Sequence, residues 1–370
     1  MNPSINLSEL PLAQAWLKLV DEQPKLRIRD AANLLGVSEA ELLASQISAG
    51  DDQQQQVTLL QGPFGPLMKQ LEAVGEVMVL TRNDAMVHEK TGQFKDLTLH
   101  GPVEHQMGLA LGTIDLRLFL NHFVFGFEVI NNTPAAPRRS LQFFDASGTA
   151  VHKVYARDNT DMQQWQQLVE QFRAGDQLTS LVTTSSAEES LLTSPAGLDS
   201  AALLQDWQNL KDVHHFQAML KKHQLARVPA YQVIGEEYAV PLATSAFEQA
   251  LESARESGQP IMVFVGNRGC IQIHTGPLHN LKRLGPWFNI LDGDFNLHAS
   301  TDQIASLWLV RKPTSDGIIS SLEAYDSHGQ QLALLFGQRQ NGEAERQQWR
   351  TLLQKLASRY RLDSTEEQSA

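Results

Sequence analysis

The sequence lacks the features that define several common classes of protein. Its 370 residues contain a single cysteine, Cys270, which excludes an internal disulfide and any C-x-x-C metal or redox motif. No apolar run approaches the roughly 20 residues that a membrane-spanning helix requires. The N-terminal stretch has no charged segment followed by an apolar one, so no signal peptide is expected. These absences favour a soluble, cytoplasmic protein.

Positive charge is also scarce. The chain has 30 Lys and Arg against 42 Asp and Glu, which gives a formal net charge of −12. Because affinity for nucleic acid depends on Lys and Arg neutralising phosphates, this balance disfavours nucleic acid as a partner. With 42% hydrophobic residues the chain can bury a core, and its length predicts two domains or one large composite domain.

Short stretches of the sequence recur in the same order further along the chain. Three of four matched pairs lie 184 residues apart, and the fourth pair lies 181 apart. An ordered set of matches at nearly one offset indicates an internal duplication. The pairs are "MVLTRN" (78–83) with "MVFVGN" (262–267), "KTG" (90–92) with "HTG" (274–276), "SLQFFDASG" (140–148) with "SLEAYDSHG" (321–329), and "QQW" (163–165) with "QQW" (347–349).

The duplication predicts an N-terminal repeat over residues 1–174 and a C-terminal repeat over 201–361. Residues 175–200 are rich in Ser, Thr and small residues and are expected to form a linker, while 362–370 form a polar tail. Each repeat shows a helical segment, then short alternating segments separated by Gly, Asn, Asp or Pro, and then a closing helix. This pattern predicts the α+β class, with an antiparallel sheet in each repeat.

The segment 212–231, "DVHHFQAMLKKHQLARVPAY", gathers three histidines, two lysines and an arginine among apolar residues. If it is one helix, His214 and Lys221 share a face, whereas Arg227 lies about 220° round the helix from His214. Pro229 is expected to end that helix just before it, so that Arg227 would belong to a turn that folds back. The simplest interpretation is a solvated Lys/His helix face.

Two further interpretations of these nitrogens are a metal site and a haem site. Zinc favours spacings such as H-E-x-x-H, and "VHEK" (87–90) lacks the second histidine. Haem requires one imidazole for the iron, an apolar slot for the ring, and Arg or Lys for the propionates. The sequence has no C-x-x-C-H motif, so a haem would be held non-covalently. G-x-G-x-x-G, P-loop and G-x-S-x-G motifs are absent too.

The strand-like segment "DLRLF" (115–119) offers a second candidate feature for haem. Arg117 and Phe119 are two residues apart, so in a strand they point to the same face. A cation beside an aromatic ring suits a propionate and a ring edge. The alternative is an ordinary exposed arginine on a strand.

Long motifs of one known family lie in order along nearly the whole chain. Together they resemble the cytoplasmic haem-utilisation proteins of Gram-negative bacteria, the family of HemS, HmuS, ChuS and PhuS. The motifs are "RDAANLLGVSEAEL" (29–42), "HEKTG" (88–92), "GTIDLRLFL" (112–120), "DVHHF" (212–216), "GNRGCIQIHTGP" (266–277), "GPWFNILDGDFNLH" (285–298), "VRKPTSDGIISSLEAYD" (310–326) and "LLFGQR" (334–339).

The resemblance implies two repeats with centrally stacked sheets, and haem b bound in the C-terminal repeat. It implies His214 as the axial ligand of the haem iron, with the adjacent His215 as an alternative. His88 is a further candidate ligand, for a second site, although its repeat partner at offset 184 is Gln272. The other residues that the resemblance assigns to haem binding are Arg117, Phe119, Arg227, Lys312, Phe336 and Arg339.

The function that the resemblance implies is haem binding in haem-iron utilisation, for trafficking or for degradation that releases iron. Leu334 and Phe336 stand where some members have Gln and Tyr, which removes hydrogen bonds beside the ligand. An alternative is a haem-oxygenase-like enzyme, which would need an external reductase because no flavin or nicotinamide motif is present. Expected partners are a haem oxygenase or a component of a haem importer. A distant alternative is a DNA-binding regulator built on residues 27–43, with Gly36 at a helix-turn-helix turn.

Overall fold

The computed structural model describes residues 10–24, 26–47, 55–184, 198–340 and 342–362. They form two compact units. Among these described residues, the first unit comprises those up to 81 together with 90–184 and 267–271, and the second comprises 82–89, 198–266 and those from 272 onward. Each unit consists mainly of residues from one half of the chain but includes a short segment from the other half. Much of the predicted linker and nearly all of the predicted tail lie outside the described residues.

The first unit begins with three helices and continues as an antiparallel sheet. The order of strands in this sheet is β1-β7-β8-β9-β2, and a small β4-β5-β6 meander accompanies it. The helices are α1 (Leu12–Glu22), α2 (Ile28–Leu35), α3 (Glu39–Ala44), α4 (Gly65–Gln70) and α5 (Met162–Phe172). The strands are β1 (Gln55–Leu60), β2 (Gly75–Arg82), β4 (Thr98–His100), β5 (Met107–Ala110), β6 (Asp115–Phe119), β7 (Phe125–Asn131), β8 (Arg138–Phe144) and β9 (Ala150–Thr160).

The second unit repeats this plan with its own strands. Its sheet has the order β10-β16-β17-β18-β11, and β13, β14 and β15 form a meander. The helices are α6 (Ser200–Gln208), α7 (Phe216–Lys222), α8 (Arg227–Ile234), α9 (Ala246–Ser257) and α10 (Gln347–Tyr360). The strands are β10 (Ala239–Leu242), β11 (Ile261–Gly266), β13 (Leu281–Leu284), β14 (Trp287–Leu291), β15 (Phe295–Ser300), β16 (Ser306–Thr314), β17 (Gly317–Tyr325) and β18 (Gln331–Gly337). The α+β class and the duplicated plan are confirmed.

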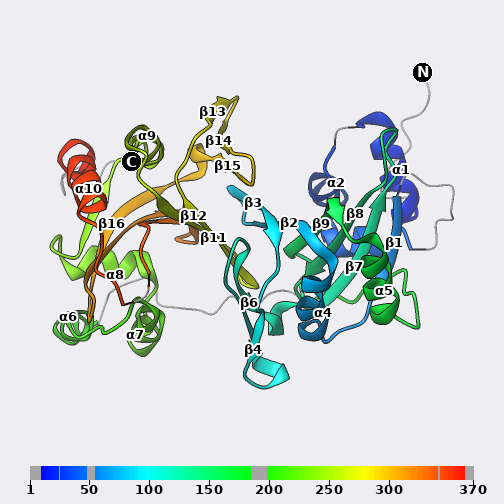
Figure 1. Ribbon diagram of the computed structural model, residues 1–370, viewed down its shortest axis with the longest axis horizontal. Helices are drawn as coiled ribbons and strands as arrows, with labels where there is room; N and C mark the ends of the chain where they lie inside the picture. The colour runs from blue at the N-terminus through cyan, green and yellow to red at the C-terminus, as the bar shows by residue number, and fades with distance from the viewer. Residues whose placement is uncertain (1–9, 25, 48–54, 185–197, 341, 363–370) are drawn as a thin grey trace. The chain divides into compact units, whose positions relative to one another are not determined.

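Helices cover both faces of the second unit's sheet. Along β16, Leu307 and Leu309 pack in a cluster with α9 and α10, whereas Trp308 and Val310 pack in a cluster with α6, α7 and α8. Successive side chains of a strand point to opposite faces, so this alternation separates two hydrophobic layers. Figure 1 shows α6, α7 and α8 grouped beside this sheet. The histidine-rich segment belongs to that group.

The repeated sequence motifs have matching structural roles. Trp165 of α5 and Trp349 of α10, from the two "QQW" stretches, are both completely buried against the sheet of their own unit. The asparagines that end "MVLTRN" and "MVFVGN" both stabilise the turn that follows. Asn83 Oδ1 accepts from the backbone of Ala85 and Met86, and Asn267 Oδ1 accepts from the backbone of Gly269 and Cys270.

The expectation about Pro229 was wrong. The chain after His214 does not form one helix, because α7 ends at Lys222 and Gln224 has a φ of 52°. A new helix, α8, begins at Arg227, and Pro229 lies in its first turn. A proline costs little there, because the first N–H groups of a helix have no partner within it. Among the described residues, no helix is long and apolar enough to cross a membrane.

A buried histidine in the first unit links stability to pH. His152 of β9 is 1% exposed, and its Nδ1 lies 3.0 Å from Thr81 Oγ1 and 3.7 Å from Cys270 Sγ. Burial lowers the pKa of His152 from 6.5 to about 3. Below pH 6.5 the unfolded chain therefore binds a proton at this position that the folded chain excludes until about pH 3.

We predict that acidification from pH 6.5 to 4 lowers the free energy of unfolding through His152 by up to about 1.4 kcal/mol per pH unit. His152→Gln should reduce this slope, and exposed His100→Gln serves as the control. Urea denaturation at several pH values measures it. Equal slopes in the wild type and His152→Gln would contradict the prediction.

Candidate functional site

His214 lies at the surface of the second unit, where a neighbouring carboxylate contacts its ring. It lies in a single 3-10 turn, Val213–His215, whose N-cap is Asp212. Asp212 Oδ1 accepts from the backbone N of His214 at 2.8 Å and lies 2.6 Å from His214 Nδ1. The His214 side chain is 73% exposed. Because Nδ1 is engaged by Asp212, Nε2 is the atom that His214 offers to a metal ion.

The charge on Asp212 suits this role. The hydrogen bond from the backbone of His214, followed by contacts with the His214 ring, lowers the pKa of Asp212 below its usual value. A carboxylate that accepts from one nitrogen of an imidazole fixes its tautomer and raises the basicity of the other nitrogen. His215, the alternative ligand, is also exposed and is the N-cap of α7. The carboxylate of Asp212 thus distinguishes the two histidines, because it accepts from the backbone N of His214 and contacts the His214 ring.

A carboxylate lies completely buried beneath this segment. Glu323 of β17 is 0% exposed and has hydrogen bonds at both oxygens. Oε1 accepts from Lys312 Nζ at 2.5 Å and from Ser321 Oγ at 2.6 Å. Oε2 accepts from the hydroxyls of Tyr231 and Tyr325 at 2.6 and 2.5 Å. Hydrogen bonds from neutral and charged donors together compensate for the loss of water around the carboxylate.

Arg227 is a more loosely held member of the same cluster. Its Nη1 lies 3.4 Å from Glu323 Oε2, which is longer than an ordinary N–H to carboxylate hydrogen bond. Its side chain is 23% exposed, whereas that of Lys312 is 4% exposed. Both cations contact the ring of Phe216, at 5.1 Å for Arg227 and 4.5 Å for Lys312. Arg227 is therefore the cation of this pair that solvent reaches more easily.

The electrostatics of the cluster follow from burial and opposite charge. Burial raises the pKa of Glu323, but Lys312 and Arg227 outweigh it and hold that pKa well below its usual value. Burial lowers the pKa of Lys312, and Glu323 opposes this effect. Burial, together with the charge of Glu323, raises the pKa values of Tyr231 and Tyr325. The cluster contains two cations and one anion.

The "LLFGQR" segment supplies two other predicted residues. Phe336 of β18 is half-buried, and Lys312 Nζ lies 6.0 Å from its ring. Arg339 donates to Asp316 Oδ2 at 3.2 Å and to the carbonyl of Glu343 at 2.7 Å. The structure thus brings Phe336 close to Lys312, while Arg339 is engaged by its own loop and by the turn between β16 and β17.

The remaining predicted residues have local partners of their own. Arg117 and Phe119 lie on β6 in the first unit, where Arg117 donates to Asp115 and is 25% exposed. Their grouping with His214 stays a prediction. His88 is completely buried, and its Nδ1 lies 2.8 Å from Nε2 of Gln272, its repeat partner. A second haem site at His88 also stays a prediction, and it would require the strands around His88 to move.

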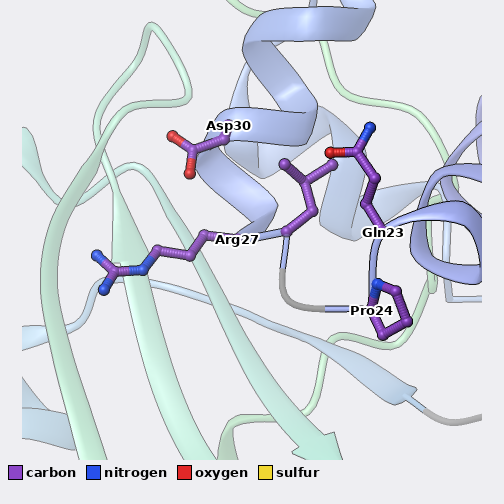
Figure 2. A pocket seen from close by; sticks show the side chains of 5 residues that line it. Gln23, Pro24, Arg27 and Asp30 are labelled. Atoms are coloured by element: carbon purple, nitrogen blue, oxygen red, sulfur yellow. The ribbon is translucent and has the colours of Figure 1, made fainter.

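A pocket elsewhere has different chemistry. It has a volume of about 510 Å³ and lies in the first unit, at the start of α2 (Figure 2). None of the described residues that line it is a histidine or an aromatic residue, so these residues do not suit a haem. Among the described residues, no three His, Cys, Asp or Glu side chains gather as a metal site. The pocket is lined by Gln23, Pro24, Leu26, Arg27 and Asp30.

Comparison with known proteins agrees with the duplicated plan. Residues 36–172 and 224–356 each match the model of the haemin-degrading HemS.ChuX domain. The chain belongs to this family. Hemin transport protein HmuS of Yersinia pestis is 37% identical over 354 residues, which cover 94% of this chain and 98% of that protein.

Solved structures of HemS-family proteins have the same fold as this chain. Holo-PhuS of Pseudomonas aeruginosa, described as a heme-binding protein, is 44% identical, with a TM-score of 0.89 over 95% of this chain and 99% of its own. ChuS of Escherichia coli, described as a heme oxygenase, is 37% identical, with a TM-score of 0.82 over 94% of this chain and 99% of its own.

Sequence reasoning did not identify Glu323, Tyr231, Tyr325 or Asp212. A signal for two of them exists within the HemS-family repeats. The matched stretches "SLQFF" and "SLEAY" differ where Gln142 is replaced by Glu323 and Phe144 by Tyr325. A charge that appears in one copy of an otherwise matched buried strand indicates a role specific to that copy.

We predict that Lys312→Met lowers the free energy of unfolding by about 3–5 kcal/mol, because it leaves Glu323 buried without its closest cation. Lys312→Met combined with Glu323→Gln should recover most of this loss, since Glu323 then carries no charge. Guanidinium denaturation measures both. A double variant as unstable as the single one would contradict this account.

Proposed function

We propose that the chain is a cytoplasmic haem-binding protein of haem-iron utilisation, which holds one haem b non-covalently in its C-terminal repeat. The observation that carries this proposal is His214, an exposed imidazole with a carboxylate fixed behind its Nδ1. That arrangement is typical of histidines that ligate metals. Family relatives described as a hemin transport protein and a heme-binding protein support haem as the ligand.

The second requirement of a haem site is positive charge for the propionates. Arg227 provides it in this proposal, because its guanidinium is held only loosely by Glu323 and is partly exposed. Lys312 adds positive charge to the same cluster. By resemblance to the family, the surroundings of the haem are completed by Arg117, Phe119, Phe336 and Arg339. His215 is the alternative ligand of the iron, and His88 is a candidate ligand for a second site.

A second candidate function is oxidative opening of the tetrapyrrole, since ChuS is described as a heme oxygenase. The reaction needs electrons, and the sequence has no flavin or nicotinamide motif, so an external reductase would be a partner. Near Lys312, Phe336 offers no hydrogen bond where some family members have Tyr. We therefore propose a carrier that delivers haem to an oxygenase and receives it from an importer component.

We predict that His214→Ala weakens hemin binding by more than about tenfold and changes the Soret spectrum, because the iron loses its protein ligand. His215→Ala is the matched control and should bind within about threefold of the wild type. Titration of purified protein with hemin, followed at the Soret band, measures both. Equal effects of the two substitutions would overturn the assignment of His214.

The carrier and the enzyme differ in the fate of the complex under reductant in air. We expect the Soret band to persist with ascorbate and catalase present. Decay of the band, with release of iron and an open-chain tetrapyrrole, would show the enzyme instead.

A further inference from the structure

The resemblance assigns Lys312 to direct contact with the ligand, but its surroundings in the second unit indicate otherwise. Its Nζ lies 2.5 Å from Glu323 Oε1 and 3.4 Å from Ser321 Oγ, and the ring of Phe216 lies 4.5 Å away. The side chain is 4% exposed. Lys312 therefore offers little surface to a ligand, and moving it away from a completely buried carboxylate would be strongly unfavourable.

Arg227 has the opposite surroundings. Glu323 Oε2, the oxygen nearest to it, already accepts from two tyrosine hydroxyls, and Arg227 Nη1 stands at 3.4 Å. Its side chain is exposed enough to meet a ligand without leaving the cluster. With Glu323 charged and both cations present, the cluster has a net charge of +1. One added carboxylate would neutralise it.

The duplication supports a coupled role for Lys312 and Glu323. At the offset of 181 residues, Lys312 corresponds to Asn131 and Glu323 to Gln142. The strand registers agree, because Lys312 pairs with Ile319 and Asn131 pairs with Arg138, again 181 residues apart. In the first repeat both positions are neutral amides, so the two charges are present together or absent together.

We propose that Lys312 is a positioning residue that neutralises Glu323 and thereby leaves Arg227 able to bind a carboxylate of the ligand. This inference rests on the proposed function and specifies how the site recognises a carboxylate. Without Lys312, Arg227 would be the only cation of the cluster that balances the negative charge of Glu323. Arg227 would then be drawn into an internal ion pair with no net charge, and a ligand carboxylate would have to compete with Glu323.

The test is a hemin titration of Lys312→Met and of the double variant Lys312→Met with Glu323→Gln. The single variant should bind hemin at least about tenfold more weakly, because Arg227 is then held by Glu323. The double variant restores a net charge of +1 with Arg227 as its only cation, and it should bind within about threefold of the wild type. Direct contact through Lys312 predicts that the double variant binds as weakly as the single one, which would overturn the proposal.

Hemin dimethyl ester, whose propionates carry no charge, separates this effect from damage to the fold. Lys312→Met should bind the ester within about twofold of the wild type, and a parallel loss for hemin and ester would overturn the proposal. Lys222→Met removes an exposed lysine that donates to Asp206 on neighbouring α6, and it should leave hemin affinity unchanged. If Lys312→Met does not fold, the hemin affinity of the double variant, compared with that of the wild type, still distinguishes a positioning role of Lys312 from direct contact.

Failure of the proposed function gives a different result. If the wild-type protein shows no saturable Soret complex with hemin, the proposed function is overturned and this inference with it. If the wild type binds hemin and the double variant does not, only the role of Lys312 is overturned.

Discussion

A single buried carboxylate organises the candidate site. Glu323 has no access to water, so its charge must be matched by hydrogen bonds and by cations within the protein. Two strands and α8 supply them: Lys312 from β16, Tyr325 from its own strand, and Tyr231 and Arg227 from the helix. These contacts fix the start of α8 against the sheet. The histidine turn precedes α7, which packs in the same layer.

The two units share a frame but not its chemistry. The tryptophans of the closing helices are completely buried in both units, and the asparagines after β2 and β11 accept from backbone N–H groups in the same pattern. The buried face that holds Glu323 and Tyr325 in one unit holds Gln142 and Phe144 in the other. Duplication thus gave two copies of a stable scaffold, of which one bears charges that a binding site can use.

Much of this frame could be predicted from the sequence, because repeated motifs and alternating strands depend on local spacing. The segment around His214 was harder, since the turn at Gln224 and the new helix at Arg227 depend on packing against the sheet. The repeat comparison marks Glu323 as unusual, but its ion-pair and hydrogen-bond partners could not be predicted, because Arg227 and Tyr231 are 96 and 92 residues away in the chain. The prediction that Arg227 belongs to a turn just before Pro229 was wrong, because Arg227 begins α8 and Pro229 lies within that helix.

The exchange of short segments between the units has a consequence for synthesis of the chain. The first unit includes residues 267–271, where Asn267 Nδ2 donates to the carbonyl of Val151 and Gly269 gives its carbonyl to the backbone N of Phe119. A ribosome must therefore translate almost three quarters of the protein before the N-terminal unit can be completed. Until then, the strands that bear Val151 and Phe119 have backbone groups without their final partners. The nascent N-terminal half is therefore more prone to misfolding before this point of synthesis than after it.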